Sequence, residues 1–578
     1  MRKLGDTGMS LNRRDVLKIA AVAGAAVTLP LARSGFTATT ALRMPASKMP
    51  APFTLPFLRP SELGPVGSSS VACSDGVLRD YPSYEITQRF SVAEIMPGFK
   101  TPVFGYNGEV PGPTLRMTRG APVLVRQTNL LQRPPAAPYQ SVPMPSKYTS
   151  DPWQRSTSTH LHGSASLPQY DGYASDLTFP GQVKKYFYPN SQDARTLWYH
   201  DHGVHHTSQN AYNGLAGLYI LHDEEEAGLG IPTGAPGSPS APYDVPMIVR
   251  DAMFATDGSF IYDDNSESGV YGDVPLINGV PWPLMEVEPR IYRFRILNAS
   301  VSRSYEWQLS DGRSTVPMTV IGTDGGLMPQ PKVVSKFRHG MAERYEIIID
   351  FSKYKGARIT LKNLMPKNNV GYDSIKQVMQ FKVGTTVTTD AGNAIPADWS
   401  EKLTTPECMT WTESALLAQG VPKREFKFIR SNSRWTINGE TWENVIDSGY
   451  THSMAEPELG AVEIWDLTNT SGGWFHPVHI HLVDFQVLSR NGSAANVLPH
   501  ERGPKDVVYV GENETVRVAM RFSGPSAGEG WAEPRGRYMM HCHNLVHEDH
   551  DMMMQFSVGD PDNVPDLDPI TADGARAL

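Results

Sequence analysis

The sequence is poor in cysteine. Its 578 residues include only Cys73, Cys408 and Cys542. Three cysteines allow at most one disulfide, so the fold cannot depend on a disulfide framework. If Cys542 holds a metal, Cys73 and Cys408 are the only pair left. They could form a disulfide in an oxidising compartment, but the sequence gives no distance between them, and the question stays open.

Positive charge is also scarce. The sequence has 52 basic and 61 acidic residues, which gives a net charge of −9. Residues 1–40 contain six basic and two acidic side chains, or +4, so the rest of the chain carries −13. An acidic surface argues against nucleic acid as a partner and gives no reason to expect an anionic membrane.

Long apolar runs are absent except near the N-terminus. There Arg13-Arg14 precede an apolar segment from Ile19 to Leu31. This segment is too short to span a bilayer, and the twin arginines are typical of the pathway that exports folded proteins. We expect residues 1–45 to be a twin-arginine signal peptide and linker. The protein should be periplasmic or secreted, without stable membrane insertion.

Glycine and proline are plentiful, at 50 and 47 residues, which favours many short strands joined by turns. Three Asn-Gly turns are each followed by an alternating strand that ends in asparagine, and these asparagines lie 169 and 171 residues apart. Such a period is a whole domain, and the alternation predicts a β-sandwich. The three strands are Val123–Asn129, Tyr292–Asn298 and Val462–Asn469.

Each repeat closes with a further strand, and the stretches between repeats are rich in Gly, Pro, Ala and Thr, as linkers are. Within the second of these stretches, Ala415–Ala418 predicts a short helix. We predict three domains in series, 75–223, 244–385 and 424–560, followed by a tail at 561–578. The closing strands are Leu197–His202, Ala342–Phe351 and Arg537–His543.

Ten of the seventeen histidines lie in four short clusters. Each His-x-His pair on a strand offers two imidazoles to the same face, which suits metal binding. The pairs come only from the first and third repeats, so we expect them to meet between those domains, with the second domain as a spacer. The clusters are His160-Leu-His162, His200-Asp-His202, His476-Pro-Val-His479-Ile-His481, and His541-Cys-His543 with His547.

The last cluster combines two kinds of ligand. On a strand, Cys542 points away from His541 and His543. A cysteine with His547, Met552 and a histidine from elsewhere is the ligand set of a blue-copper site. The eight paired imidazoles are too many for one metal ion. Zinc sites use three or four protein ligands, and non-haem iron sites usually include a carboxylate ligand. Copper therefore fits this set of imidazoles best. In the first repeat Asp201 stands where Cys542 stands, and that repeat cannot build a thiolate site of its own.

These motifs resemble those of three-domain multicopper oxidases over residues 75 to 560. Within the family the chain looks most like bilirubin oxidases, with spore-coat laccases and phenoxazinone synthases slightly further off. The resemblance implies an all-β fold of three cupredoxin-like Greek-key β-sandwich domains in series. It is carried by Tyr170–Asp176, Ala194–His202, Val287–Arg295, Met341–Glu346, His476–Phe485 and His541–Met553.

The resemblance also implies a complete set of ligands for four copper ions. His476, Cys542, His547 and axial Met552 match the type 1 ligands. His160 and His479 match the type 2 pair. The six type 3 ligands match His162, His200, His202, His481, His541 and His543.

The implied activity is one-electron oxidation of phenols, aromatic amines or bilirubin-like donors at type 1 copper, coupled to four-electron reduction of O2 to water. Cys542 is bonded through the backbone to His541 and His543, which provides an electron route. Glu548 and Asp171 match acids near the cluster that are thought to deliver protons, although charge compensation is the alternative reading. Trp474 matches a tryptophan beside type 1 copper and could contact an aromatic donor, or simply pack in the core.

Two other functions stay open. A Cu(I) or Mn(II) oxidase is possible, although residues 385–425 contain only Met409 where the cuprous type usually carries a methionine-rich insertion. A non-enzymatic copper carrier is less favoured, because no ligand position is missing. We expect the protein to be a monomer. Its expected partners are the twin-arginine export machinery, a small aromatic donor and O2.

Overall fold

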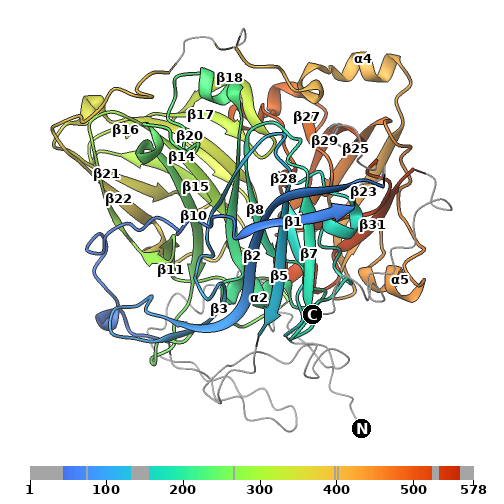
Figure 1. The fold of residues 1–578 in the computed structure, drawn as a ribbon, viewed down its shortest axis with the longest axis horizontal. Helices are drawn as coiled ribbons and strands as arrows, with labels where there is room; N and C mark the ends of the chain where they lie inside the picture. Colours follow the sequence, from blue (N-terminus) through green and yellow to red (C-terminus); the bar gives the residue numbers. More distant parts are fainter. Residues whose placement is uncertain are drawn as a thin grey trace, which may run out of the picture. The chain divides into compact units, whose positions relative to one another are not determined.

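The computed structural model describes residues 43–72, 76–131, 155–264, 267–395, 399, 402–523 and 533–559. The twin-arginine segment, Cys73 and the tail at 561–578 lie outside these residues. Strands dominate the described chain and form six sheets, each built from strands of one third of the sequence (Figure 1). The predicted all-β class is confirmed.

The N-terminal third, called domain 1, has two facing sheets. One has the order β1 (Gly67–Ala72), β2 (Leu78–Ala93), β5 (Val123–Leu130) and β7 (Val183–Tyr188), with β3 (Thr101–Tyr106) paired to β2. The other has the order β4 (Leu115–Thr118), β9 (Ala216–His222), β8 (Arg195–Asp201) and β6 (Thr159–His162). Strand β1 precedes residue 75, where the sequence predicts the domain to begin, and its partner is β2.

The central third, domain 2, contains the largest sheets. The first sheet consists of β12 (Val280–Pro281), β11 (Val274–Ile277), β10 (Asp244–Ala252), β14 (Ile291–Asn298), β20 (Arg344–Asp350), β17 (Met318–Thr323) and β18 (Gly326–Val334). The second consists of β13 (Leu284–Val287), β22 (Gln377–Val383), β21 (Arg358–Asn363), β15 (Tyr305–Ser310) and β16 (Thr315–Val316), with β19 (Phe337–His339) paired to β15.

Domain 3 repeats the arrangement of domain 1. Its first sheet is β24 (Arg434–Ile437), β23 (Lys423–Ser431), β25 (Val462–Asn469), β29 (Glu514–Arg521) and β27 (Phe485–Arg490). Its second sheet is β28 (Val507–Val510), β26 (His476–Ile480), β30 (Gly536–Cys542) and β31 (Met553–Val558). The predicted strands of the three repeats are β5, β14 and β25, and the predicted closing strands are β8, β20 and β30.

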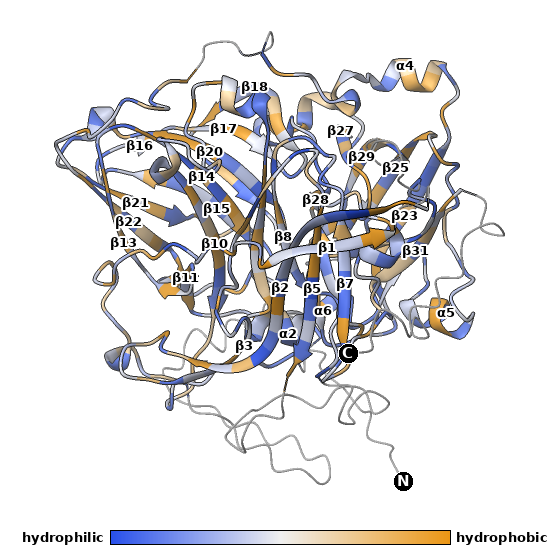
Figure 2. Cartoon of the chain, viewed as in Figure 1, coloured by the Kyte–Doolittle hydropathy of each residue, from blue (hydrophilic) through white to orange (hydrophobic). Residues whose placement is uncertain are grey.

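Each domain has its own core, in which apolar side chains from its two sheets pack together. Hydrophobic and hydrophilic residues both occur along the strands (Figure 2). The domain 3 core includes Trp465, Val478, Met540 and Met554. Buried domain cores of this kind contribute most of the folding free energy. They also hold the ligand-bearing strands β6, β8, β26 and β30 in fixed positions.

Helices are short and lie between strands. They are α2 (Thr207–Asn213), α3 (Glu224–Gly228), α4 (Glu413–Ala418), α5 (Trp442–Asp447) and α6 (Leu545–Asp549). Helix α4 confirms the short helix predicted around Ala415–Ala418. Thr412 begins it by accepting a hydrogen bond from the Ala415 backbone N–H. Among the described residues, no helix has the length and apolar character needed to cross a membrane.

Candidate metal centre

Strand β30 separates two groups of candidate ligands. It pairs with β26, with His541 opposite His479 and Cys542 opposite Val478. Because successive side chains alternate, Cys542 enters the core of domain 3, while His541 and His543 face histidines from domain 1. This alternation is as the sequence predicts.

The first group surrounds the Cys542 thiol. The Sγ atom lies 3.2 Å from His476 Nδ1 and 3.7 Å from His547 Nδ1. Met552 is fully buried in the same core, and its carbonyl accepts a hydrogen bond from the Cys542 backbone N–H at 3.1 Å. Strand β26, strand β30 and helix α6 therefore bring His476, Cys542 and His547 together, and the turn before β31 places Met552 in the same core.

Two tryptophans form the wall of this group. Trp435, which the sequence does not single out, stacks on the His547 ring with centroids 3.7 Å apart, and Trp474, which the sequence does single out, meets the same ring edge-on at 5.5 Å. The domain 2 carbonyl of Ser268 lies 3.3 Å from His547 Nε2. Trp435 stands just before a repeated Asn-Gly turn, but nothing in the sequence links it or Ser268 to His547.

The second group contains eight histidines from domains 1 and 3. His162, His200 and His543 form one triad in which single ring nitrogens lie within 4.8 Å of one another, and His202, His481 and His541 form another. His160 and His479 approach each other through Nε2 atoms 3.4 Å apart. The prediction that the pairs from the first and third repeats meet is confirmed.

Hydrogen bonds fix which nitrogen most of these rings present. A carbonyl oxygen only accepts, so the Nδ1 atoms of His160, His200 and His479 must donate to the carbonyls of Asp171, Asp201 and Asp506. Their Nε2 lone pairs are then free for a metal. Such contacts to the outer nitrogen are typical of histidines that bind metals.

Two carboxylates complete the surroundings. Asp171 Oδ2 lies 2.7 Å from His481 Nδ1, and Glu548 Oε2 lies 2.8 Å from His541 Nδ1. Burial opposes ionisation of Glu548, but the neighbouring His541 and His202 rings lower its pKa to about 2. Both acids that the sequence singles out therefore contact histidines of the cluster.

The buried atoms fit a metal. In the triad of His162, His200 and His543, the ring nitrogens His162 Nδ1, His200 Nε2 and both nitrogens of His543 are buried without a hydrogen-bond partner. Burial lowers the pKa of His202 and of His476 to about 3, which keeps both rings neutral, as metal ligands must be. Burial raises the pKa of the Cys542 thiol, so a bound cation is needed to form its thiolate.

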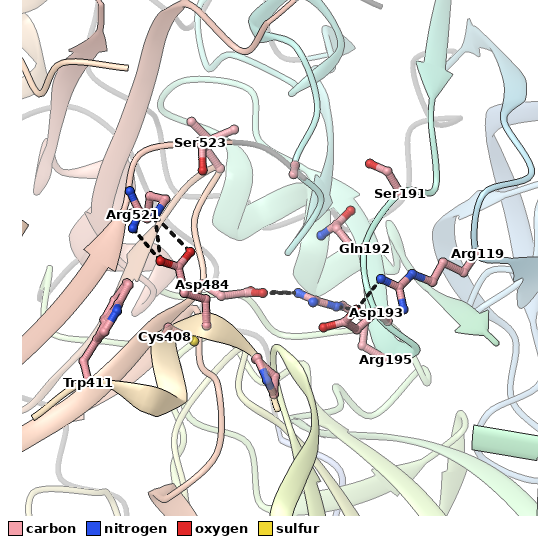
Figure 3. A pocket seen from close by; sticks show the side chains of 14 residues that line it. Arg119, Ser191, Gln192, Asp193, Arg195, Cys408, Trp411, Asp484, Arg521 and Ser523 are labelled. Atoms are coloured by element: carbon pink, nitrogen blue, oxygen red, sulfur yellow. Dashed lines mark hydrogen bonds and ion pairs between the residues drawn. The ribbon is translucent and has the colours of Figure 1, made fainter. Parts of the chain in front are cut away.

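A separate pocket of about 200 Å³ lies where domain 1, the 402–423 segment and domain 3 meet. Arg195 crosses it to Asp484 at 2.7 Å, and Cys408 and Trp411 line its other side (Figure 3). Cys408 is a buried free cysteine. None of the clustered histidines lines this pocket, so we do not assign the metal chemistry to it.

Comparisons with known proteins agree with this geometry. Residues 90–153 and 150–226 match one multicopper oxidase domain model, and residues 421–562 match another. A bilirubin oxidase of Albifimbria verrucaria is 38% identical over 485 residues, covering 82% of this chain and 76% of that protein. A laccase of Bacillus subtilis strain 168 is 32% identical over 503 residues, covering 80% of this chain and 91% of the laccase.

The chain belongs to the multicopper oxidase family. The crystal structure of the McoA multicopper oxidase of Aquifex aeolicus matches the oxidase with a TM-score of 0.70 at 28% identity, covering 88% of this chain and 100% of McoA. The predicted cupredoxin-like architecture is thereby confirmed. Family membership implies that the oxidase uses copper and reduces oxygen.

Export is supported separately. Residues 10–30 of the oxidase match the twin-arginine translocation signal sequence. The oxidase is therefore exported by that pathway, to the periplasm or beyond, as the twin arginines at 13 and 14 predict.

Proposed function

We propose that the oxidase binds four copper ions within one chain and acts as a monomer. Domains 75–223 and 424–560 would supply every ligand, and domain 244–385 none. The type 1 ligands would be His476, Cys542, His547 and Met552. His160 and His479 would hold type 2 copper, and the type 3 pair would take His162, His200 and His543 on one side and His202, His481 and His541 on the other.

The observation that carries this proposal is the position of Cys542 between His541 and His543. The thiol reaches His476 and His547, while the flanking rings reach the domain 1 histidines. When bound, copper supplies the one-electron oxidation of a donor and the four-electron reduction of oxygen to two waters. The backbone of β30 gives electrons a covalent route between the two groups.

The donor in this proposal is aromatic. Trp474 is half-buried and stands edge-on to His547, so its outer face offers a flat apolar surface to a phenol, an aromatic amine or a tetrapyrrole. The names of the bilirubin oxidase and laccase relatives support the same donor classes. We propose Trp474 as a donor-contacting residue.

Oxygen reduction consumes protons inside a closed site, and acids must deliver them. We propose Glu548 for this role, because its carboxylate contacts His541 and lies 3.6 Å from His202. Asp171 contacts His481 and His160 from the opposite side and would act in the same way or balance the charge of the cluster.

Oxygen uptake by copper-loaded protein tests the donor. We expect uptake with bilirubin, a methoxyphenol and an aminophenol, with slower rates when Trp474 is changed to Ala. If oxygen is consumed with Cu(I) or Mn(II) but with none of the aromatic donors, the donor would be a metal ion instead. Absence of uptake with every donor, in protein that retains four copper ions, would point to a carrier and contradict the proposal.

A further inference from the structure

A buried arginine of domain 2 lies against the histidine cluster. Arg344 begins β20, and its side chain is inaccessible to solvent. Its guanidinium donates to both carboxylate oxygens of Asp506 in domain 3, with Nη1 to Oδ1 at 2.7 Å. It also donates through Nε to the Thr196 carbonyl of domain 1 at 2.9 Å. One side chain therefore contacts all three domains.

Asp506, which binds Arg344, also contacts two histidines of the cluster. Its Oδ1 atom lies 3.1 Å from His162 Nε2, and its carbonyl accepts a hydrogen bond from His479 Nδ1 at 2.9 Å. The carboxylate oxygen that receives Arg344 Nη1 is the same one that meets His162. Arg344 is thus two hydrogen bonds away from His479 and His162.

His162 differs in orientation from five of the other seven histidines of the cluster. His160, His200, His479, His481 and His541 each direct Nδ1 at a carbonyl or carboxylate. His162 instead directs Nε2 at Asp506 and leaves Nδ1 without a hydrogen-bond partner, and it forms a triad with His200 and His543. In this orientation each ring of the triad retains at least one ring nitrogen without a hydrogen-bond partner.

The position after His162 has no room for a side chain. Gly163 follows His162 with a φ of +86°. A Cβ atom at this position would lie 2.5 Å from Arg344 Nη2 and 2.6 Å from Asp506 Oδ2. These separations are below any real Cβ contact, so the salt bridge occupies the space that a side chain would need.

We infer that Arg344 is a positioning residue for His162, acting through Asp506. The inference rests on the proposed role of His162 as a type 3 ligand. Arg344 holds the Asp506 carboxylate in place, Asp506 accepts the His162 Nε2–H, and the Nδ1 lone pair is thereby aimed at the metal. Domain 2, which supplies no ligand, is then part of the metal centre.

Replacing Arg344 by Met tests the inference, because Asp506 loses its partner while every ligand stays. Contacts of this kind are worth about 10- to 100-fold in metal affinity or activity. We expect oxygen uptake to fall at least tenfold and copper to fall below four ions per chain. The visible absorption of the Cys542 site should remain. Copper detected by electron paramagnetic resonance should rise as a fraction of the total, because loss of one type 3 ion uncouples the other.

Two further variants separate positioning from stability. Arg490→Met removes another buried arginine, which binds both Glu501 oxygens at 2.7 and 2.9 Å without touching a candidate ligand. It should lower the melting temperature and leave the copper content unchanged. Asp506→Asn keeps an oxygen that can accept the His162 proton, so it should retain more copper than Asp506→Ala.

The outcomes distinguish the inference from the proposed function. Wild-type protein without four copper ions would overturn the proposed function itself. Wild-type protein with four ions, and an Arg344→Met variant with the same copper content and resonance spectrum, would overturn only the role of Arg344. Equal copper loss in Arg344→Met and Arg490→Met would also overturn it, because general destabilisation would then be the cause.

Discussion

The choice of ring nitrogen matters at the scale of single residues. In the thiol group, His476 and His547 present Nδ1 to Cys542. In the cluster five rings place Nδ1 against a carbonyl or carboxylate, whereas His162 places Nε2 against Asp506. A histidine can serve as a ligand only through a nitrogen that carries no proton, so hydrogen bonds to the opposite nitrogen decide which contacts are available.

Among the described residues, Cys542 alone places a thiol near His476 and His547, and replacing it by Ser removes that thiol. The variant should lose its visible blue absorption and its oxidase turnover together, because a hydroxyl is not a soft thiolate ligand. Absorption spectroscopy and oxygen uptake measure both. Cys408→Ser is the matched control, since Cys408 is also buried but contacts no histidine of either group. A blue, active Cys542→Ser enzyme would contradict the assignment.

Replacing Glu548 by Gln keeps a hydrogen-bonding side chain beside His541 and removes the acid. If Glu548 delivers protons, kcat for oxygen reduction should fall about 10²- to 10⁴-fold. The visible absorption should not change, because Cys542, His476 and His547 are untouched. The solvent deuterium isotope effect on kcat should also differ between the Glu548→Gln variant and the wild-type enzyme. Unchanged kcat would assign Glu548 to charge balance alone.

At the scale of single elements, a tight turn carries Asp171 to the cluster. Short helix η3 (Pro168–Tyr170) ends at Asp171, and Gly172 follows with a φ of +77°. A Cβ atom on Gly172 would lie 2.6 Å from His160 Cα on β6. The turn therefore presses against the strand that bears His160, which fixes the Asp171 carbonyl on that ring.

Gly172→Ala should destabilise the oxidase by more than the cost of a left-handed alanine alone. That conformation costs roughly 1–2 kcal/mol, and crowding against β6 adds to it. Gly181→Ala is the control, because Gly181 has a φ of +90° with nothing within 4 Å of its Cβ position. Thermal melting compares them. Equal shifts in melting temperature would show that β6 tolerates the added methyl group.

The sequence predicts these elements well where the pattern is local. The closing strands expected at Leu197–His202 and Arg537–His543 are β8 (Arg195–Asp201) and β30 (Gly536–Cys542). The reason is that alternation and Asn-Gly turns act over a few residues. Met552 and Met554 lie in the domain 3 core and Met553 lies in a separate cluster, because successive side chains of an extended chain point to opposite faces.

At the scale of the whole molecule, a buried ionic network fastens the segment between domains 1 and 2 to domain 2. Arg293 and Arg295 of β14 bind Glu226 of α3, Glu346 of β20 and Asp244 of β10. Burial alone would raise the pKa of Glu226 and Asp244, but the two guanidinium charges lower both. Buried charges of this kind are stable only while all partners remain.

These shifts predict acid lability. A carboxyl with a lower pKa in the folded state binds fewer protons than in the unfolded chain, where its pKa is about 4. Its contribution to stability is complete above about pH 5 and is lost as the pH falls below that. Denaturant unfolding at several pH values should show this loss, with a shallower dependence in Glu226→Gln. If the free energy of unfolding depends on pH equally in the wild type and in Glu226→Gln, Glu226 does not cause the acid lability.

The contacts between domains could not be predicted from the sequence. Arg344, Asp506 and His162 are separated by more than 150 residues, and no local period joins them. The sequence predicts that domains 1 and 3 share the cluster because paired histidines occur in both. It predicts domain 2 as a spacer because that domain lacks such pairs, and so it misses Arg344 at the cluster and Ser268 beside His547.

The alternation along β30 has a consequence for folding quality. Side chains repeat every two residues, so a slip of β30 by one position against β26 and β31 would exchange the faces of the thiol and the imidazoles. A misregistered sandwich could remain compact and yet lose both groups of ligands. The colour of a refolded sample is therefore a measure of strand register, and colourless protein need not be unfolded protein.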